Sequence, residues 1–208
     1  MKLLRDRKVA TRMPVLIAAG ALLLASCQSG PTARIKDSDE GNLVGINSAG
    51  SAVYEQQVEA VVQKMLAGEI ASNRNLQQAR ICVLRVENRS AEDLGDWSEQ
   101  LYSLISGSID SSDRFGILST RALDRALQEG DMIQDDLLLP KYQRKFVEIL
   151  EAAGNPIQYL VFPSLTSGST SGGSGVSQRD YLMELELVAL ENGESRKYSA
   201  KISKEYER

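Results

Sequence analysis

The chain contains no histidine, and cysteine occurs only as Cys27 and Cys82. Without histidine there can be no Ser-His-Asp or Cys-His nucleophile system, and zinc sites lose their usual imidazole ligands. The Gly/Ser-rich stretch at 167–175 lacks the Lys-Ser/Thr of a P-loop, never matches G-x-G-x-x-G and fails the G-x-S-x-G pattern. We therefore expect no catalytic activity, no metal and no cofactor. A hydrolase that works with two carboxylates alone is the enzymatic alternative that this composition leaves open.

The first 27 residues resemble the signal of a bacterial lipoprotein. Five bases and one acid lie within residues 1–12, an uncharged apolar stretch of 13 residues follows at 13–25, and Leu24-Ala25-Ser26-Cys27 matches the lipobox. Such a stretch suits a signal-peptide core and falls short of the ~20 residues that a membrane-spanning helix needs. The resemblance implies cleavage between Ser26 and Cys27 and acylation of the Cys27 thiol. A buried core helix or an amphipathic anchor is the alternative.

The residue after Cys27 and the charge balance bear on where the mature protein would lie. Gln28 occupies the position where lipoproteins kept in the inner membrane commonly carry Asp, so the resemblance implies the periplasmic face of the outer membrane. Losing five bases and one acid with the signal leaves 19 basic and 27 acidic side chains, a net charge of −8. This charge argues against binding to nucleic acid or anionic lipid. Attachment must then come from acyl chains, of which two or more give stable anchoring.

Composition divides the chain into three segments. Residues 1–26 form the predicted signal peptide, and residues 27–50 form a lipidated N-terminus and a flexible tether rich in Gly, Ser, Asp and Asn. Residues 51–208 are long enough for one compact domain with its own core. Cys82 lies in an apolar run and has no second cysteine for a disulfide once Cys27 is acylated, so we predict a buried, unreactive thiol.

Hydrophobic spacing in the globular part predicts a single α/β domain. Helices are expected at 52–70, 97–109, 120–129 and 140–153, and strands at 79–87, 115–118, 158–162, 179–190 and 195–205. Early strands separated by helices favour parallel pairing, and the closing strands favour antiparallel pairing. We expect a mixed sheet of about five strands with helices on both faces.

Capping and turn residues indicate where several elements begin or end. Asp96, with an acid three residues later, suggests a capping box at the second helix. Ser119 or Thr120 can cap the third helix. Asn192-Gly193 predicts a type I′ turn between the last two strands.

Two polar clusters are candidates for function. Asn88-Arg89-Ser90 follows a predicted strand and precedes a helix, at the carboxyl end of the strand, where α/β sheets tend to place their sites. Its arginine could make forked hydrogen bonds with a carboxylate of a partner protein, whereas turn chemistry with a solvated arginine is the alternative. Asp135 and Asp136 precede Pro140, which suits a first helical turn, so we expect them to complement the helix dipole rather than to form a catalytic pair.

Five segments behind the lipobox carry a further resemblance; they are Val62-Gln-Lys-Met-Leu66, Val83-Leu-Arg-Val-Glu-Asn-Arg-Ser90, Asp113-Arg-Phe-Gly-Ile-Leu118, Gln158-Tyr-Leu-Val-Phe162, and Met183-Glu-Leu-Glu-Leu-Val188 with Asn192-Gly-Glu194. In this order they resemble the LpoB family, outer-membrane lipoproteins that activate class A penicillin-binding proteins. The resemblance implies a domain similar to the N-terminal domain of TolB. It also implies an adaptor role in peptidoglycan synthesis, with a periplasmic penicillin-binding protein as partner and no small-molecule substrate.

The sequence also departs from the LpoB pattern. Best-known members have a long Pro-rich tether, whereas this tether contains only Pro31, and Ser195 stands where a Trp commonly follows the last Gly-Glu turn. Relatives of the same fold occur among curli-secretion lipoproteins. A structural or assembly role in an envelope complex is therefore the alternative function.

Overall fold

A computed structural model describes residues 32–35, 51–72, 79–171 and 176–207, all of which belong to one of the two units of the chain, Pro31–Arg208. Its elements are, in chain order, β1 (Thr32–Ile35), α1 (Ser51–Ser72), β2 (Ala79–Val83), β3 (Glu87–Arg89), α2 (Trp97–Asp110), β4 (Phe115–Ile117), α3 (Thr120–Glu129), the 3-10 helix η1 (Gln134–Leu138), α4 (Pro140–Ala152), β5 (Tyr159–Ser171), β6 (Val176–Ala189) and β7 (Ser195–Glu207).

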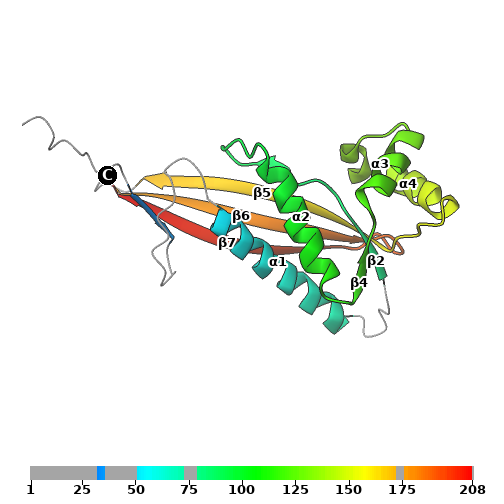
Figure 1. Ribbon diagram of the computed structural model, residues 1–208, viewed down its shortest axis with the longest axis horizontal. Helices are drawn as coiled ribbons and strands as arrows, with labels where there is room; N and C mark the ends of the chain where they lie inside the picture. Colours follow the sequence, from blue (N-terminus) through cyan, green and yellow to red (C-terminus); the bar gives the residue numbers. More distant parts are fainter. Residues whose placement is uncertain (1–31, 36–50, 73–78, 172–175, 208) are drawn as a thin grey trace, which may run out of the picture. The chain divides into compact units, whose positions relative to one another are not determined.

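The strands form one mixed sheet of seven, in the order β1-β7-β6-β5-β2-β4, with β3 beside β5 (Figure 1). β2 runs parallel to β4 and β5, and β3 runs parallel to β5. β5, β6, β7 and β1 pair antiparallel. The predicted parallel and antiparallel parts of the sheet are confirmed, and the sheet exceeds the expected five strands by two short ones, β1 and β3.

The predicted strand 79–87 is shorter in the structure, where β2 ends at Val83, and β3 begins at its last residue, Glu87, and runs into the predicted loop as far as Arg89. The backbone N–H of Leu84 still donates to the carbonyl of Val161 in β5, at 3.0 Å. The next N–H, that of Arg85, donates instead to the side-chain oxygen of Gln134 at 2.8 Å. The N–H groups of successive strand residues point to opposite sides, so the Arg85 donor faces away from β5, on the side where β4 has ended, and Gln134 of η1 supplies its acceptor. The chain pairs with β5 again from Glu87 onward.

Strand β1 falls inside the predicted tether, so the structure differs there from the sequence expectation. Its four residues pair antiparallel with the end of β7, whose edge satisfies their backbone groups. The predicted signal peptide 1–26, Ser26 and Cys27 lie outside the described residues, and the segment boundaries at 26 and 50 stay predictions. In the described ranges, no helix combines the length and the apolar character that crossing a bilayer requires.

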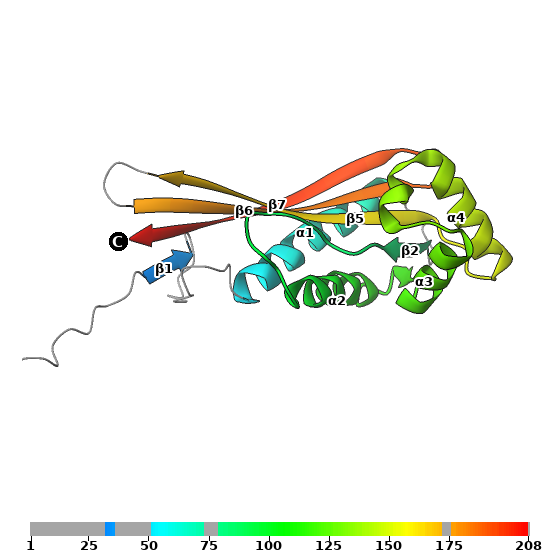
Figure 2. The same cartoon turned by 90° about the horizontal axis from the view of Figure 1, so that it is seen from above.

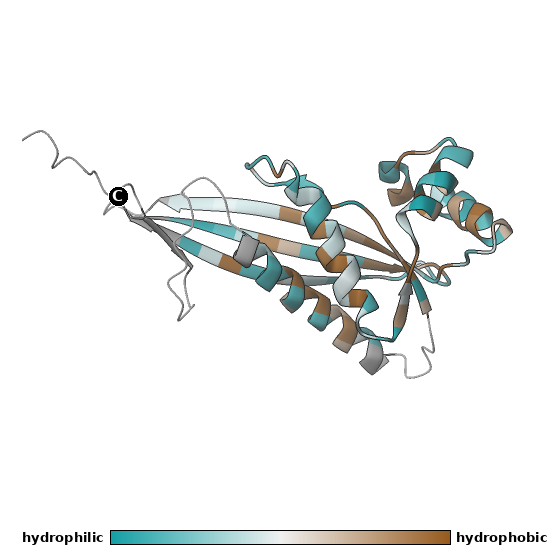
Figure 3. Cartoon of the chain, in the orientation of Figure 1, coloured by the Kyte–Doolittle hydropathy of each residue, from teal (hydrophilic) through white to brown (hydrophobic). Residues whose placement is uncertain are grey.

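Helices pack on both faces of the sheet, as the sequence predicts (Figure 2). Successive residues of a strand point to opposite faces, so Val161 belongs to one core and its neighbour Leu160 to the other. The core under α1 and α2 includes Tyr54, Val61, Met65, Leu101, Ile105, Val161, Tyr181 and Met183. The core under α3 and α4 includes Cys82, Leu118, Leu123, Leu137, Phe146, Leu150 and Leu160. Figure 3 shows the apolar segments gathered along these inner surfaces.

The face of the sheet that α3 and α4 cover becomes polar where these helices no longer cover it. Along β5, the residues that share the side of Leu160 become Phe162 and then Ser164, whose register partners in β6 are Glu186 and Glu184. Glu186 in turn lies opposite Lys197 of β7. We call this surface the open face, and it comprises Glu87, Arg89, Ser164, Glu184, Glu186 and Lys197.

Two predicted element starts are confirmed, and one is wrong. Ser119 is the N-cap of α3, and its side chain accepts a backbone N–H at 3.3 Å; Pro140 occupies the first turn of α4. The capping box at Asp96 is wrong, because this residue is itself helical (φ −66°, ψ −13°) and its side chain makes no cap bond. The Asp93 carboxylate accepts the N–H of Gly95 at 3.0 Å instead, so the turn that leads into α2 is held earlier in the chain.

The β6–β7 hairpin forms at the predicted place with a different turn. A type I′ turn needs positive φ at both central residues, but Gly193 has one (71°) and Asn192 does not. The N–H of Gly193 donates to the carbonyl of Ala189 at 2.8 Å, which closes a longer loop. The type I′ prediction is therefore wrong. β5 and β6 also run further than predicted, into the Gly/Ser-rich stretch as far as Ser171 and from Val176 onward.

Cys82 is a buried thiol in the core beneath α3 and α4, 1% exposed. Burial raises the pKa of this thiol from 9.0 to about 12, so almost no thiolate is present near neutrality. We expect the folded mature protein not to react with DTNB at pH 8, and the chain unfolded in guanidinium to release one equivalent of thionitrobenzoate. Rapid labelling of the folded protein would contradict this placement of Cys82.

Candidate functional site

The predicted cluster Asn88-Arg89-Ser90 spans the end of β3 and the turn that follows it. The Asn88 side chain serves this turn: its oxygen accepts the N–H and the hydroxyl of Ser90, at 2.9 and 2.6 Å, and its amide donates to the carbonyl of Glu92 at 2.7 Å. Asn88 and Ser90 therefore do the local turn chemistry that was the alternative interpretation. Arg89 extends onto the open face and is the member of the cluster that a partner could reach.

Arg89 forms an exposed ion pair with Glu87. One guanidinium nitrogen lies 2.6 Å from a Glu87 carboxylate oxygen, and the two side chains are 52% and 55% exposed. The hydrogen bond from Arg89 lowers the pKa of Glu87, and the same bond, aided by the Glu87 charge and by Glu184 and Glu186, raises the pKa of Arg89. Both groups are thus held in their ionised forms. An exposed pair of this kind contributes little to stability, about 0.2–1 kcal/mol.

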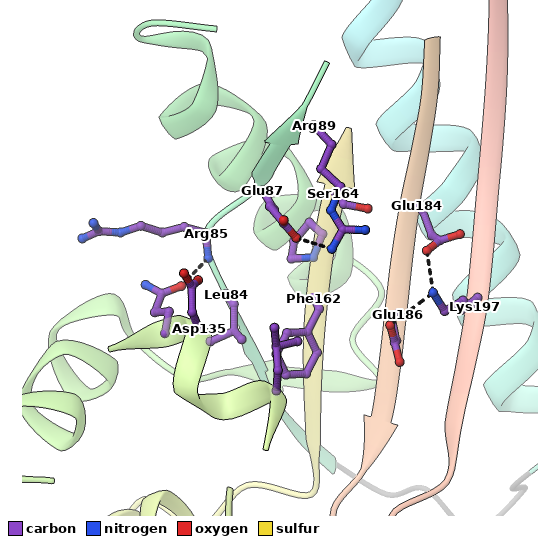
Figure 4. Close-up of a pocket in the computed structure, with 13 residues that line it drawn as sticks. Leu84, Arg85, Glu87, Arg89, Asp135, Phe162, Ser164, Glu184, Glu186 and Lys197 are labelled. Atoms are coloured by element: carbon purple, nitrogen blue, oxygen red, sulfur yellow. Dashed lines mark hydrogen bonds and ion pairs between the residues drawn. The ribbon is translucent and has the colours of Figure 1, made fainter. Parts of the chain in front are cut away.

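A pocket of about 100 Å³ lies beside Arg89 on the open face (Figure 4). Lys197 holds one side of it, with its ammonium 2.9 Å from Glu184 and 3.4 Å from Glu186. The hydrogen bond to Glu184, supported by the charge of Glu186, raises the pKa of Lys197. The floor therefore carries two groups of paired charges, Arg89 with Glu87 on β3 and Lys197 of β7 with Glu184 and Glu186 of β6, and β5 lies between them.

The opposite wall of the pocket comes from η1. Gln134, Asp135 and Leu138 line it together with Phe162 of β5. Asp136 does not join its neighbour there, because its carboxylate accepts the backbone N–H of Ile133 at 2.9 Å. Asp135 and Asp136 thus lie in the first turn of η1, a short helix that precedes α4. Asp135 lines the pocket, whereas Asp136 binds the backbone at the start of η1, and this arrangement does not suit a catalytic pair.

The carboxylates of this pocket are paired with basic side chains. A general acid near neutrality needs a carboxyl whose pKa is raised, whereas the pKa of Glu87 is lowered. Glu184 and Glu186 are both engaged by Lys197. Within the described ranges, no group of three or more Cys, Asp or Glu side chains is arranged to hold a metal ion. Paired charges beside an apolar wall can instead exchange partners with the charged groups of another protein.

A second charged cluster, partly buried, lies on the other face of the sheet, where Glu92 accepts hydrogen bonds from Arg179 and from the hydroxyl of Tyr181, both at 2.5 Å. Lys204, the register partner of Arg179, is fully buried beside them, with its ammonium 6.0 Å from the centre of the Tyr181 ring. Burial, with the help of Arg179, lowers the pKa of Lys204 from 10.5 to about 8, and Glu92 partly opposes this shift. The cluster joins the β3–α2 loop to the sheet.

The sequence indicated Arg89 but did not indicate its neighbours on the open face. Glu184, Glu186 and Lys197 flank the predicted hairpin, and the alternation of acids along one strand with a lysine on the next was the available signal. The η1 wall could not be found in this way, because no periodic pattern links residues 134–138 to β5.

Comparisons with known proteins give structural neighbours only. No protein-family model matches the chain, and no curated protein matches its sequence. Among solved structures, the LpoB C-terminal domain from Salmonella enterica is 19% identical, with 71% of this chain and 97% of that chain covered and a TM-score of 0.48. The same domain from Escherichia coli is 18% identical, with 71% and 97% covered and a TM-score of 0.48. The NMR structure of E. coli LpoB is 16% identical, with 95% and 96% covered and a TM-score of 0.46.

The LpoB resemblance seen in the ordered sequence segments thus recurs among the structural neighbours. All three TM-scores lie below 0.5, so these neighbours do not establish a function for this chain.

Proposed function

We propose that the chain is a lipoprotein of the outer membrane that faces the periplasm, where it binds and activates a class A penicillin-binding protein. The lipobox at Leu24-Ala25-Ser26-Cys27 supports the anchor, and the ordered segments within residues 52–205 support the adaptor role. The observation that carries the proposal is Arg89, a half-exposed guanidinium that pairs with Glu87 on a sheet face where Lys197 pairs with Glu184 and Glu186. A surface of this kind can form forked hydrogen bonds with a partner carboxylate.

The proposed role is that of an activator without catalysis of its own. Binding would restrain or rearrange the synthase, and this chain would supply a surface rather than a reacting group. The expected absence of histidine-dependent chemistry agrees with that role. The protein alone should then neither extend nor cleave glycan strands, and this serves as the first control in any synthase assay.

Reversing the charge of Arg89 tests the proposed binding surface. We expect Arg89→Glu in the full mature lipoprotein to weaken binding to a class A penicillin-binding protein about 30-fold, since an arginine at the centre of an interface commonly contributes 2 kcal/mol or more. The new carboxylate would also lie beside Glu87, Glu184 and Glu186 and repel a partner acid. Affinity is measured by biolayer interferometry in detergent, and activation by glycan-chain synthesis from lipid II.

Arg114→Glu is the matched control, because Arg114 is also exposed but precedes β4 beside the start of β2, whereas Arg89 ends β3 beyond the other end of β2. Both variants should melt within a few degrees of the wild type. If Arg89→Glu binds and activates as well as Arg114→Glu, the open face is not the interface. A ring-sized oligomer of the wild type in size-exclusion chromatography, without binding to any synthase, would favour the assembly role instead.

A further inference from the structure

Three large aliphatic side chains protrude around η1. Ile133 is 63% exposed, Leu138 57% and Leu139 50%, whereas Leu137 between them is fully buried. Single exposed aliphatics are ordinary on protein surfaces, but a cluster within seven residues marks a place where a partner can bury apolar area. We call residues 129–139 the acidic–aliphatic loop.

The acidic–aliphatic loop is held rigidly. The N–H of Ile133 donates to the Asp136 carboxylate at 2.9 Å, and the Gln134 side chain accepts the N–H of Arg85 at 2.8 Å. On the far side of the loop, the Gln143 amide donates to the carbonyl of Leu137 at 2.8 Å, and the Lys145 ammonium donates to that of Gly130 at 2.7 Å. The exposed side chains are therefore presented in a fixed arrangement, which lowers the entropy that binding would cost.

The negative charge of the loop indicates which kind of partner surface it can bind. From residue 126 to residue 139 the chain carries four acids and no base; they are Glu129, Asp131, Asp135 and Asp136. The Lys145 ammonium of α4, which donates to the carbonyl of Gly130, offsets one of these charges and leaves the loop acidic. A second copy of this chain would bring the same acidic loop, and an anionic lipid surface would be repelled. The complementary surface is an apolar hollow whose rim carries Arg or Lys side chains.

We infer that the acidic–aliphatic loop docks into an apolar, basic-rimmed hollow on a partner protein. The loop is continuous with the open face, because Gln134, Asp135 and Leu138 line the same pocket as Arg89. Loop and open face then form one binding surface, with aliphatic side chains on one side and paired charges on the other. This inference deepens the adaptor role proposed above and rests on it for the identity of the partner.

Photo-crosslinking in cells locates the partner without assuming what it is. Benzoylphenylalanine is placed at position 133 or 139 of the full-length protein, and at Gln100 on α2 as the matched exposed control on the other face of the sheet. We expect an adduct from 133 and 139 that is absent from 100. The captured protein is identified by mass spectrometry, purified, and tested for binding to the mature lipoprotein in detergent.

The binding assay then tests the chemistry of the loop. The double variant Leu138→Ala/Leu139→Ala should weaken binding to the captured protein about 30-fold. Asp131→Asn/Asp135→Asn should slow association about three- to tenfold at low salt and reduce its salt dependence, whereas Asp110→Asn on α2 should change neither. Melting temperatures should stay nearly unchanged, since the substituted side chains are at least half exposed or lie at the surface.

Each outcome bears on the inference and on the proposed function separately. No adduct specific to 133 or 139, or an affinity that the leucine and aspartate variants leave unchanged, overturns the loop as a docking element. If the captured protein is a class A penicillin-binding protein and the variants weaken its binding, both statements stand. If it is another basic-rimmed protein and the variants weaken that binding, the inference stands and the proposed function fails.

Discussion

Replacing Cys27 by serine is expected to remove the protein from the outer-membrane fraction and to leave it without acyl mass. In the wild type, cleavage after Ser26 and attachment of two or three acyl chains should be visible in the intact mass. The effect should be large because a net charge of −8 gives the mature chain no electrostatic attraction to anionic lipid. Each buried methylene of an acyl chain contributes about 0.8 kcal/mol, so losing every chain removes the whole anchor.

Cys82→Ser is the control for this substitution, because Cys82 is the chain's other cysteine and lies buried in the described core. That variant should keep the acyl mass and the membrane location of the wild type. A Cys27→Ser protein that keeps both would show that the lipobox interpretation is wrong. The fold of residues 51–208 and the open face would be untouched by that result.

Local signals in the sequence were sufficient for most elements. Helix α3 begins after the predicted cap at Ser119, and α4 begins at Pro140, because both residues act on the backbone beside them. The parallel and antiparallel parts of the sheet also followed from the order of helices and strands. Each of these features depends on contacts that the nearby sequence largely specifies.

Features that depend on distant residues were missed. β5 runs to Ser171 through a stretch of poor strand formers, because β6 offers a continuous ladder of register partners as far as Ser177. The predicted strand 79–87 ends at Val83 instead, and the backbone N–H of Arg85 beyond it bonds to Gln134, a side chain that lies far along the chain. The capping box at Asp96 failed because Asp93 holds the turn first.

The candidate site also combines features that the local sequence specifies with features that depend on distant residues. Arg89 could be selected because it follows a predicted strand, and the structure places it at the end of β3 with a half-exposed side chain. Its role in binding a partner stays a prediction. Its pairing with Glu87 and the charged floor depend on the register of β3, β5, β6 and β7, which a single sequence does not specify. The exposed leucines of the acidic–aliphatic loop were beyond sequence reasoning, because a run of leucines ordinarily predicts burial and only Leu137 is buried fully.

The charged cluster around Glu92 gives the largest stability effect that we expect. Glu92 holds Arg179 and the Tyr181 hydroxyl, and its charge also favours the charged form of Lys204. In Glu92→Gln, Arg179 loses its ion pair with Glu92 and Lys204 loses the nearby negative charge that favours its protonated form, so the free energy of unfolding at pH 7 should fall by about 3 kcal/mol. Urea denaturation measures this change. Adding Lys204→Met should recover part of the loss, because a buried cation is then replaced by an apolar side chain of similar length.

The pH dependence of Lys204 distinguishes this electrostatic account from simple packing. The unfolded chain binds the Lys204 proton up to a pKa near 10.5, whereas the folded chain releases it near 8. The unfolded state therefore binds more protons between these values, and the contribution of Lys204 to stability rises as the pH increases from 8 to 10.5. Below pH 8 the cost of burying the charge is present in full.

Other groups titrate in the same range, so the difference between wild type and Lys204→Met is the quantity to measure. Cys82 acts in the opposite sense: its pKa is raised from 9.0 to about 12, so the unfolded chain loses this proton first and stability falls above pH 9. Both proteins contain Cys82, and its contribution cancels in the difference. Lys204→Met should be the more stable protein at pH 7, and its advantage should shrink steadily toward pH 10.5. An advantage that stays constant with pH would mean that Lys204 is buried without its charge being penalised.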